Sequence, residues 1–532
     1  MTQRKTDLMS RRPLAIPLTA AFLAFNLYLP LAYAQGAADD KTPTAVEKQH
    51  PGGGRSEPER KPTAADALPA DAVTPHTITL DGRDVAYTAT AGTISLTNEK
   101  GERSAEIFYV AYTLNGAPRA TRPITFAFNG GPGAGAAYLQ VGALGPRVLD
   151  YGGGRELPFT SGKVIDNPDT WLDLTDLVFI DPVESGYSRS TISDDETRKE
   201  FLGVKQDLDE FGRIIHQLLT HLERMGSPVY LAGESYGGFR AARLPRLLAA
   251  NEGIVVRGAV LVSPALEFSL LGRGSFNPMP WVVRIPSYAA VALEAQGKLS
   301  PTALADAEHF ALGDYLNGIV TPPVDAGAAD RFYQSIADLI GVPEPTVARW
   351  RGRVPLGVFL KEARHGEQAL LSRYDGSVAS PDAYPSSYND QGGDPVLAGL
   401  NGPLTSGFVN FARDELNFKT DRRYILLNGE LGRHWNWREG EGGFGQGSAD
   451  ASDDLREGLA LEPRLHVLIA HGMTDLQTPY LGSRYVISQL PESLTRDRVT
   501  LALYAGGHMM YLRPTSRAAL HRDARAIYAA GE

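Results

Sequence analysis

The stretch Val229-Tyr230-Leu231-Ala232-Gly233-Glu234-Ser235-Tyr236-Gly237 decides the fold predicted for this chain. Its first four residues are an apolar run, typical of a strand buried on both faces. The run ends in a Gly-x-Ser-x-Gly turn, and a helical pattern follows over residues 239–250. Two glycines allow a turn tight enough to expose the serine hydroxyl. The order of strand, tight turn and helix therefore predicts an α/β sheet with Ser235 at the carboxyl end of a strand.

Further apolar runs on both sides of this stretch indicate the rest of the sheet. The runs lie at residues 124–128, 177–180, 260–262, 465–470 and 499–504, and all but the 260–262 run, which Ser263-Pro264 follows, end in a glycine-rich, acidic or histidine-containing loop. Helical patterns such as that of residues 205–225 lie between several of them. This alternation predicts a mixed, mostly parallel sheet flanked by helices. Ligands of such sheets bind outside the carboxyl ends of the strands.

The chain divides by composition into five predicted segments. Residues 1–34 read as a cleaved export signal, because basic residues precede an apolar stretch that ends in Ala32-Tyr33-Ala34. A disordered linker is predicted next, since its Gly, Pro and charged residues cannot build a core. The remaining segments are a first core part with an N-terminal antiparallel meander, a mostly helical cap insertion and a second core part. The boundaries of the last four are 35–74, 75–265, 266–415 and 416–532.

Charge and composition restrict the location and the partners. The 532 residues are 43% hydrophobic and 21% charged, which is ordinary for a globular protein. The net charge of −10 and the lack of a basic stretch argue against a nucleic-acid partner. The export signal predicts a periplasmic or secreted protein, by either the general or the twin-arginine route, with no membrane span after cleavage. The sequence leaves the oligomeric state open.

The cysteine count removes several kinds of chemistry. The chain has no cysteine, which excludes disulfides, thiolate nucleophiles and cysteine-ligated metals. We expect no metal and no cofactor.

A serine nucleophile needs a base, and the base needs an orienting carboxylate. The α/β-hydrolase fold places them in the chain order Ser, Asp, His. Five of the 11 histidines follow Ser235 by more than 150 residues, and His508 alone of these lies in a small-residue loop after the last predicted strand. Asp475 follows the strand before that one. We therefore predict Ser235, Asp475 and His508 as a catalytic triad.

An oxyanion hole needs two backbone N–H groups that face the developing negative charge. One is expected from Tyr236, directly after the nucleophile. The other is expected from Gly131 in the loop Asn129-Gly130-Gly131-Pro132-Gly133, which follows the first buried strand. A phosphate-binding loop is the competing interpretation, but no Lys-Ser/Thr follows and the dinucleotide spacing fails.

Taken together, these motifs resemble the serine carboxypeptidase family, S10. The glycine loop, the Gly233–Gly238 turn, Asp475 and Gly507-His508-Met509 carry the resemblance, as do Asn167-Pro168 with Trp171 and the stretch Asp181-Pro182 to Ser188. It covers roughly residues 120–265 and 420–515. The family hydrolyses C-terminal peptide bonds through an acyl-enzyme. The resemblance implies a peptide substrate whose terminal carboxylate contacts Asn129, Gly130 and Glu234, with Glu234 protonated.

One departure from the family pattern concerns that carboxylate site. The family usually has a second Glu before Leu-Gly-Pro, but this chain has Ala143 there. Two carboxyls that share a proton raise one pKa, so without the pair we expect Glu234 to ionise more easily. Arg147 nearby offers an alternative positive charge for a substrate carboxylate, or else is a solvated surface residue. The family's usual disulfides are absent as well.

Two other functions stay open. An esterase or acyltransferase, which the departure favours, would use the same triad on another acyl compound. An inactive scaffold that binds peptides or cell-wall material is the alternative from another class.

Trp435 and Trp437 are candidates for a pocket wall or for aromatic packing, and Asp181 and Glu184 are candidates for orienting groups or for loop structure.

Overall fold

The computed structural model describes residues 68–150, 162–272, 276–364, 366–388, 392–438 and 445–531. The chain divides after Pro58 into two units, and all described residues belong to the second. The predicted export signal, and the predicted linker up to residue 67, lie outside the described residues. Within the described ranges, no helix combines the length and the apolar character needed to cross a bilayer.

A ten-stranded sheet forms the centre of the second unit, in the order β1-β2-β3-β7-β4-β9-β10-β13-β14, with β8 beside β3. From β7 to β14 neighbouring strands are parallel, and β1, β2, β3 and β7 pair antiparallel. All six predicted apolar runs are strands of this sheet. The strands are β1 (Ala72–Leu80), β2 (Arg83–Thr97), β3 (Arg103–Leu114), β4 (Ile124–Phe128), β7 (Asp176–Ile180), β8 (Arg189–Ser190), β9 (Val229–Glu234), β10 (Val256–Val262), β13 (His466–Gly472) and β14 (Val499–Tyr504).

The predicted N-terminal meander is present, with longer strands than the pattern indicated. β1 begins at Ala72, inside the end of the predicted linker. Residues 85–89 and 92–96, two alternating stretches separated by Thr90 and Ala91, both belong to the single strand β2. Gly92 does not break this strand, because its backbone pairs with Tyr109 and its missing side chain leaves room for Asp71.

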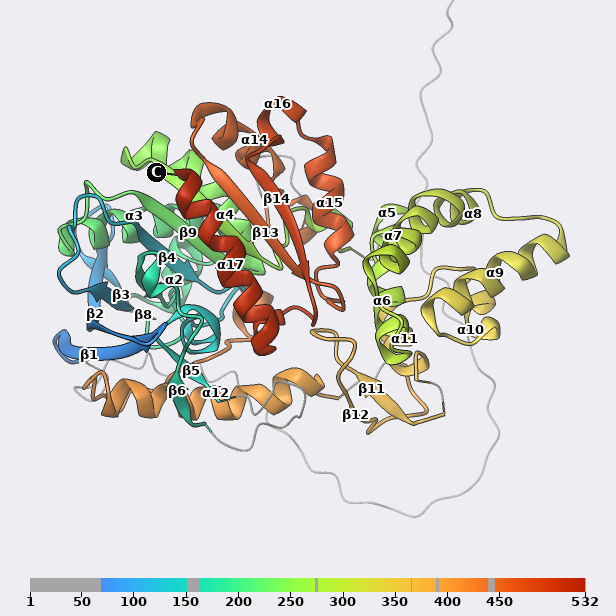
Figure 1. Cartoon of the computed structure of the whole chain (residues 1–532), viewed down its shortest axis with the longest axis horizontal. Coiled ribbons are helices and arrows are strands. Elements are labelled where there is room, and N and C mark those ends of the chain that lie inside the picture. Colours follow the sequence, from blue (N-terminus) through green and yellow to red (C-terminus); the bar gives the residue numbers. More distant parts are fainter. Residues whose placement is uncertain are drawn as a thin grey trace, which may run out of the picture. The chain divides into compact units, whose positions relative to one another are not determined.

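Alternate residues of the sheet build two apolar cores, one on each face. Phe126, Phe128 and Leu231 point into the core formed with α3 (Val204–His221), α4 (Tyr236–Leu247), α14 (Ser452–Leu461) and α15 (Tyr480–Gln489). Ala127 and Ala232 point into the other core, formed with α12 (Pro395–Asp414) and α17 (Pro514–Gly531). Figure 1 shows α17 crossing β13 and β14. Helices on both faces explain why the central strands are apolar throughout.

The remaining short elements lie in the connections of this unit. They include two turns of wider helix, η2 (Gln140–Leu144) and η4 (Leu248–Glu252), and the short helices η3 (Trp171–Asp173), η7 (Gln446–Ser448) and η8 (Met510–Leu512). The others are α1 (Ala137–Leu139), α2 (Asp194–Glu200), α13 (Leu431–His434), α16 (Glu492–Thr495), β5 (Arg147–Leu149) and β6 (Val164–Asp166).

Most of the segment predicted as a cap forms a helical cluster with its own apolar core. Its helices are α5 (Met279–Val282), α6 (Ile285–Ala295), α7 (Pro301–Phe310), η6 (Ala311–Tyr315), α8 (Leu316–Val320), α9 (Ala326–Ile340), α10 (Glu344–Arg349) and α11 (Leu356–Glu362), and η5 (Phe268–Leu270) precedes them. A hairpin of β11 (Ala369–Leu371) and β12 (Ala379–Pro381) follows.

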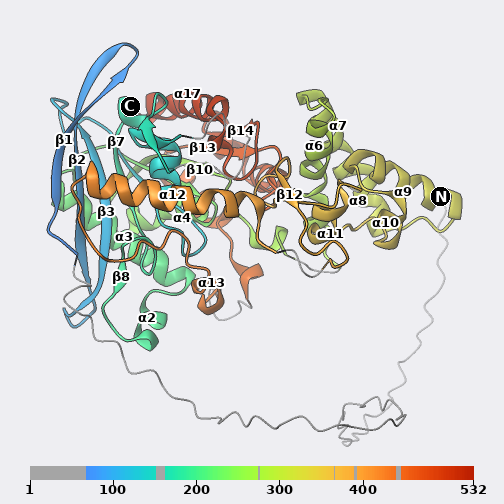
Figure 2. The ribbon, with the colours of Figure 1, turned by 90° about the horizontal axis from the view of Figure 1, so that it is seen from below.

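The last helix of the predicted cap segment, α12, packs elsewhere. Val396, Leu400, Leu404, Phe408 and Phe411 recur at helical spacing and are buried in the core shared with α17 and the sheet. Figure 2 shows α12, in orange, crossing in front of the sheet against which its apolar residues pack. The apolar stripe of α12 therefore belongs to the core of the sheet and not to that of the helical cluster.

Candidate active site

Ser235 lies at a sharp turn between β9 and α4. Its φ of +60° and ψ of −120° are uncommon for a residue other than glycine. The Ser235 N–H donates a hydrogen bond to the Val262 carbonyl at 2.9 Å. The turn requires both flanking glycines, because a Cβ on Gly237 would lie 2.6 Å from the Phe128 oxygen and a Cβ on Gly233 would collide with the Gly237 carbonyl. The backbone thus presents the Ser235 side chain at the carboxyl end of β9.

Asp475 and His508, predicted as orienter and base, are in contact. Asp475 follows β13 and His508 follows β14, two adjacent parallel strands. His508 Nδ1 lies 2.9 Å from Asp475 Oδ2, and both residues are buried. The other carboxylate oxygen, Oδ1, accepts hydrogen bonds from the N–H groups of Gln477 and Thr478. Burial opposes charge on His508, but the Asp475 carboxylate and its hydrogen bond raise the pKa of His508 above its ordinary value.

Thr478 completes this network and was not singled out from the sequence. Its hydroxyl donates to Asp475 Oδ2 at 2.7 Å and lies 3.0 Å from the Ser263 carbonyl and 3.1 Å from His508 Nδ1. An Asp followed three residues later by a Thr is a common side-chain-to-backbone turn, which is the signal that could have identified it.

The glycine loop lies against the first turn of α4. A Cβ on Gly130 would collide with the Tyr236 nitrogen, so glycine permits this close approach. Gly131 has a φ of +102°, which favours glycine. Tyr236 is the first residue of α4, and its N–H therefore has no acceptor within the helix. The structure brings the two predicted oxyanion donors, Gly131 and Tyr236, beside Ser235.

Two buried groups hold this loop. The Arg240 guanidinium donates to the Asn129 carbonyl at 2.5 Å and forms a double hydrogen bond with Asp207. Burial raises the pKa of Asp181 to about 6. The Asp181 carboxylate accepts hydrogen bonds from the N–H groups of Ala136 and Tyr187. Asp181 thus has the loop-structuring role that was one of its two interpretations.

Glu234, next to Ser235, is buried and lies beside Asn129. Asn129 Nδ2 donates to Glu234 Oε2 at 3.2 Å, and the Tyr511 hydroxyl donates to the same oxygen. Burial raises the pKa of Glu234 to about 7. The expectation that Glu234 ionises more easily than it would beside a second acid at position 143 stays a prediction. In this chain burial, with a smaller contribution from Asp475, keeps the pKa of Glu234 well above its ordinary value.

Ala143 and Arg147 occupy other surroundings. Asn167 of the Asn-Pro-x-x-Trp motif donates to the carbonyls of Ala143 and Gly145, both at 2.8 Å, and so fixes this turn. Arg147 pairs with Asp166 and with Glu415. Because two carboxylates already neutralise it and it does not line the pocket at Ser235, Arg147 is not the alternative carboxylate binder.

The two tryptophans pack against the far side of the nucleophile turn. The Tyr236 ring contacts Trp435 and Trp437 edge-on, with centroids 5.7 and 5.6 Å apart. Trp437 also packs on Phe268, at 5.0 Å. The packing interpretation of these residues is therefore confirmed.

A pocket of about 70 Å³ joins the predicted site residues. Among its lining residues are Asn129, Gly130, Gly131, Glu234, Ser235 and His508. Tyr374 and Leu397, both from the segment predicted as a cap, form part of its wall. The Tyr374 carbonyl also accepts a hydrogen bond from the His508 N–H at 2.5 Å. Nothing in the local sequence distinguished these two residues.

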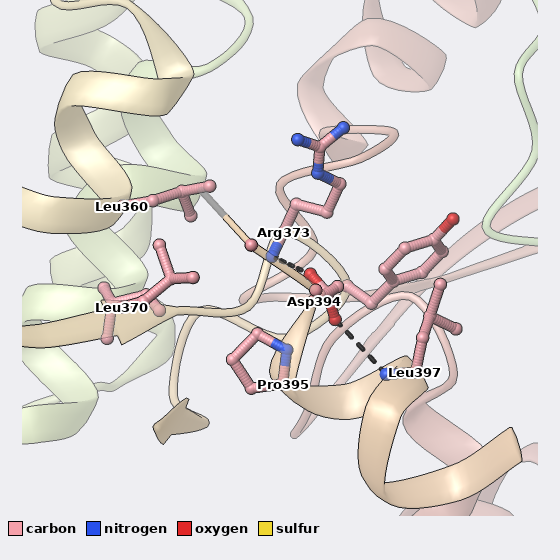
Figure 3. A pocket seen from close by; sticks show the side chains of 10 residues that line it. Leu360, Leu370, Arg373, Asp394, Pro395 and Leu397 are labelled. Carbon is pink, nitrogen blue, oxygen red and sulfur yellow. Dashed lines mark hydrogen bonds between the residues drawn. The ribbon is translucent and has the colours of Figure 1, made fainter. Parts of the chain in front are cut away.

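A second pocket of about 200 Å³ shares Tyr374 and Leu397 with the first. Figure 3 shows Leu360 and Leu370 on one side of it and Leu397 on the other. Asp394 lies between them, and accepts hydrogen bonds from the N–H groups of Arg373 and Leu397. The wall of this second pocket thus combines Leu360, Leu370, Leu371 and Leu397 with the polar residues Arg373 and Asp394, and the pocket adjoins that of Ser235.

The parallel sheet, the strained serine between β9 and α4, and the Asp and His that follow the next strands define the α/β-hydrolase fold. Residues 83–253 match the family model described as serine carboxypeptidase. The resemblance to the S10 family is therefore confirmed, and this part of the chain carries it. The matched residues include the glycine loop and Ser235, whereas Asp475 and His508 lie outside them.

Similar proteins include plant and fungal members of the family. Serine carboxypeptidase-like 37 of Arabidopsis thaliana is 29% identical over 180 residues, which are 32% of this chain and 34% of that protein. Carboxypeptidase Y homolog of Arthroderma benhamiae is 30% identical over 145 residues, 27% of this chain and 26% of that protein. The chain thus spans about a third of the length of the curated relatives it matches. A crystal structure of proline iminopeptidase from Mycobacterium smegmatis has 14% identity and a TM-score of 0.36, over 83% of this chain and 100% of that one.

Proposed function

We propose that the protein is an exported serine-type carboxypeptidase that removes residues from the C-terminus of peptides. The observation that carries the proposal is one pocket with Ser235 and His508 on the same wall as the buried pair Glu234 and Asn129. The first two residues suit acyl transfer, and the second two suit recognition of a free carboxylate.

The proposed reaction begins with His508 taking the proton of Ser235 as the serine oxygen attacks the terminal peptide carbonyl. Asp475 holds the imidazole and stabilises its positive charge. The N–H groups of Gly131 and Tyr236 bind the oxyanion. The C–N bond then breaks, and His508 gives its proton to the leaving amine, which frees the C-terminal amino acid. A water molecule attacks the acyl-enzyme with the same proton transfers and regenerates Ser235.

Recognition of the substrate carboxylate needs a hydrogen-bond donor, and Glu234 donates only when it is protonated. Since its pKa is about 7, Glu234 supports carboxylate binding at acid and near-neutral pH and loses this role as the pH rises. The terminal amide of Asn129 and the backbone at Gly130 are the other proposed contacts.

Amidation of the substrate tests this recognition. We expect an N-blocked peptide with a free C-terminus to be cleaved at pH 5.5 at least about tenfold faster than its C-terminal amide, because a charged hydrogen-bonded group is lost. Product analysis by mass spectrometry measures both rates. Equal rates would remove Asn129 and Glu234 from carboxylate binding.

The second pocket is proposed to receive an apolar side chain of the substrate. Leu397→Trp would narrow the passage between the two pockets. For the Leu397→Trp variant we expect kcat/KM to fall about tenfold with peptides that have Phe or Leu next to the scissile bond. With peptides that have Ala at that position we expect kcat/KM to change little. Asn410→Trp, at an exposed position of the same helix, is the matched control. A uniform loss across all peptides would contradict a side-chain pocket.

An esterase or acyltransferase function is the second candidate, and Ala143 favours it because the family's second acid is missing. Labelling of Ser235 by a fluorophosphonate, without any peptide product, would support that candidate. Absence of labelling in the folded protein would instead support an inactive scaffold.

A further inference from the structure

The residue missing from the family pattern and the partner that Glu234 has here lie close together. Ala143 belongs to η2, Tyr511 belongs to η8, and these two elements contact each other. Both residues are fully buried in the same apolar core. The Tyr511 hydroxyl reaches out of that core to Glu234 Oε2. Glu234 thus has a buried hydroxyl partner on an element that contacts the one carrying Ala143.

The two hydrogen bonds on Glu234 converge on one oxygen. Asn129 Oδ1 accepts a hydrogen bond from the Leu139 N–H at 3.1 Å, which turns Asn129 Nδ2 toward Glu234. Asn129 Nδ2 can only donate, and the Tyr511 hydroxyl donates as well. Oε2 therefore accepts two hydrogen bonds. The other oxygen, Oε1, has no hydrogen-bond partner among the described residues.

This arrangement favours one oxygen of Glu234 for the proton. A proton on Oε2 would face the Asn129 NH₂ group, which can only donate, and would require the Tyr511 hydroxyl to turn from donor to acceptor, whereas a proton on Oε1 meets no donor. We propose that Tyr511 is a positioning residue that replaces the missing acid: it keeps Oε2 of Glu234 as an acceptor, so that Oε1 carries the proton toward the carboxylate of a peptide substrate. The inference rests on the proposed carboxypeptidase function and concerns how that site selects its substrate.

The two kinds of partner have opposite effects on Glu234. A second carboxyl that shares a proton raises the pKa of one member of the pair. A phenol that donates a hydrogen bond stabilises the carboxylate and lowers the pKa. The groups that act on Glu234 are His508 and the hydrogen bonds of Tyr511 and Asn129, which lower its pKa, and burial and Asp475, which raise it. The hydroxyls of Tyr138 and Tyr374, whose pKa values burial raises to well above neutral, stay neutral throughout the relevant pH range.

The test measures the preference for a peptide acid over its C-terminal amide as a function of pH. In the wild type this preference is expected to disappear as the pH rises through about 7. Tyr511→Phe removes the donor to Oε2, so the pKa of Glu234 rises and the midpoint moves upward by about one pH unit. The preference below the midpoint also weakens, because the proton is then shared between both oxygens.

Three further proteins make the experiment decisive. Glu234→Gln is expected to show no midpoint near pH 7. Tyr112→Phe, which removes a buried hydroxyl bonded to Gln140 of η2 and not to Glu234, is expected to keep the wild-type midpoint. Replacement of Tyr511 by 3,5-difluorotyrosine, a stronger donor, is expected to lower the midpoint, and it keeps the test available if Tyr511→Phe does not fold.

The outcomes separate this inference from the function on which it rests. A wild type that cleaves acid and amide equally at every pH would overturn both. A wild type with a midpoint that Glu234→Gln abolishes, but that neither Tyr511 replacement moves, would keep carboxylate recognition and overturn the role of Tyr511. Shifts of opposite sign in the two Tyr511 proteins would establish it.

Discussion

Replacement of Ser235 by alanine is expected to lower the turnover of peptide substrates by about 10⁶-fold. The proposed acyl-enzyme cannot form without the serine oxygen, and the neighbouring hydroxyls cannot replace it. Ser263 Oγ donates to the His508 carbonyl and Thr478 Oγ1 donates to Asp475, so both are already engaged within the site. Steady-state kinetics on an N-blocked peptide, with fluorophosphonate labelling in parallel, measures the loss.

Ser483→Ala is the matched control for this variant. Ser483 is also a buried serine, but its hydroxyl bonds to His471 Nε2 at 2.8 Å, outside the Ser235 pocket. We expect it to retain labelling and turnover. Turnover of Ser235→Ala above about one per cent of the wild-type value would show that another nucleophile acts.

Asp475→Asn is expected to cost about 10⁴-fold in kcat. Both oxygens of Asp475 only accept hydrogen bonds: Oδ1 from two backbone N–H groups, and Oδ2 from Thr478 and His508. The NH₂ group of an asparagine would face a donor at either position. The site therefore offers no orientation that keeps both the turn and the productive His508 tautomer.

The pH profile gives this variant a second readout. Asp475 raises the pKa of His508, so its removal lowers that pKa. Since His508 acts as a base only when neutral, the rise of the residual activity with pH is expected to occur at a lower pH than in the wild type. Thr478→Val, which keeps the carboxylate, is expected to cost far less and to leave this limb nearly unmoved. An unchanged limb in Asp475→Asn would contradict the assignment of Asp475 as the partner of the base.

The strands and the nucleophile turn could be predicted from the sequence because their signals are local. A short apolar run between turn residues, with flanking glycine or proline and β-branched residues, indicates a buried strand. The glycines of the 233–237 turn and of the 129–133 loop meet backbone atoms of neighbouring segments, so their identity is set by steric limits that a short motif records. The same is true of Asn167, whose side chain fixes the Ala143 turn.

The extent of the cap, the surroundings of Arg147 and the pocket residues from the predicted cap segment were harder to predict. Helix α12 has the same kind of apolar stripe as the helices of the cluster. Such a stripe does not indicate which surface the helix packs against. The positive charge of Arg147 suggested a role in ligand binding, but in the structure Asp166 and Glu415 neutralise that charge. Tyr374 and Leu397 line the pocket only because the chain returns there after a long excursion.

The sequence by itself determined the α/β sheet, the exposed serine and the glycine loop beside it, because periodicity and close backbone contacts leave a local record. Only the tertiary structure decided that Asp475 meets His508, that Thr478 joins them, and that Tyr511 donates a hydrogen bond to Glu234. These contacts join residues 30 to 277 positions apart. Burial then sets the pKa of Glu234, and burial depends on the packing of the whole chain rather than on any segment of it.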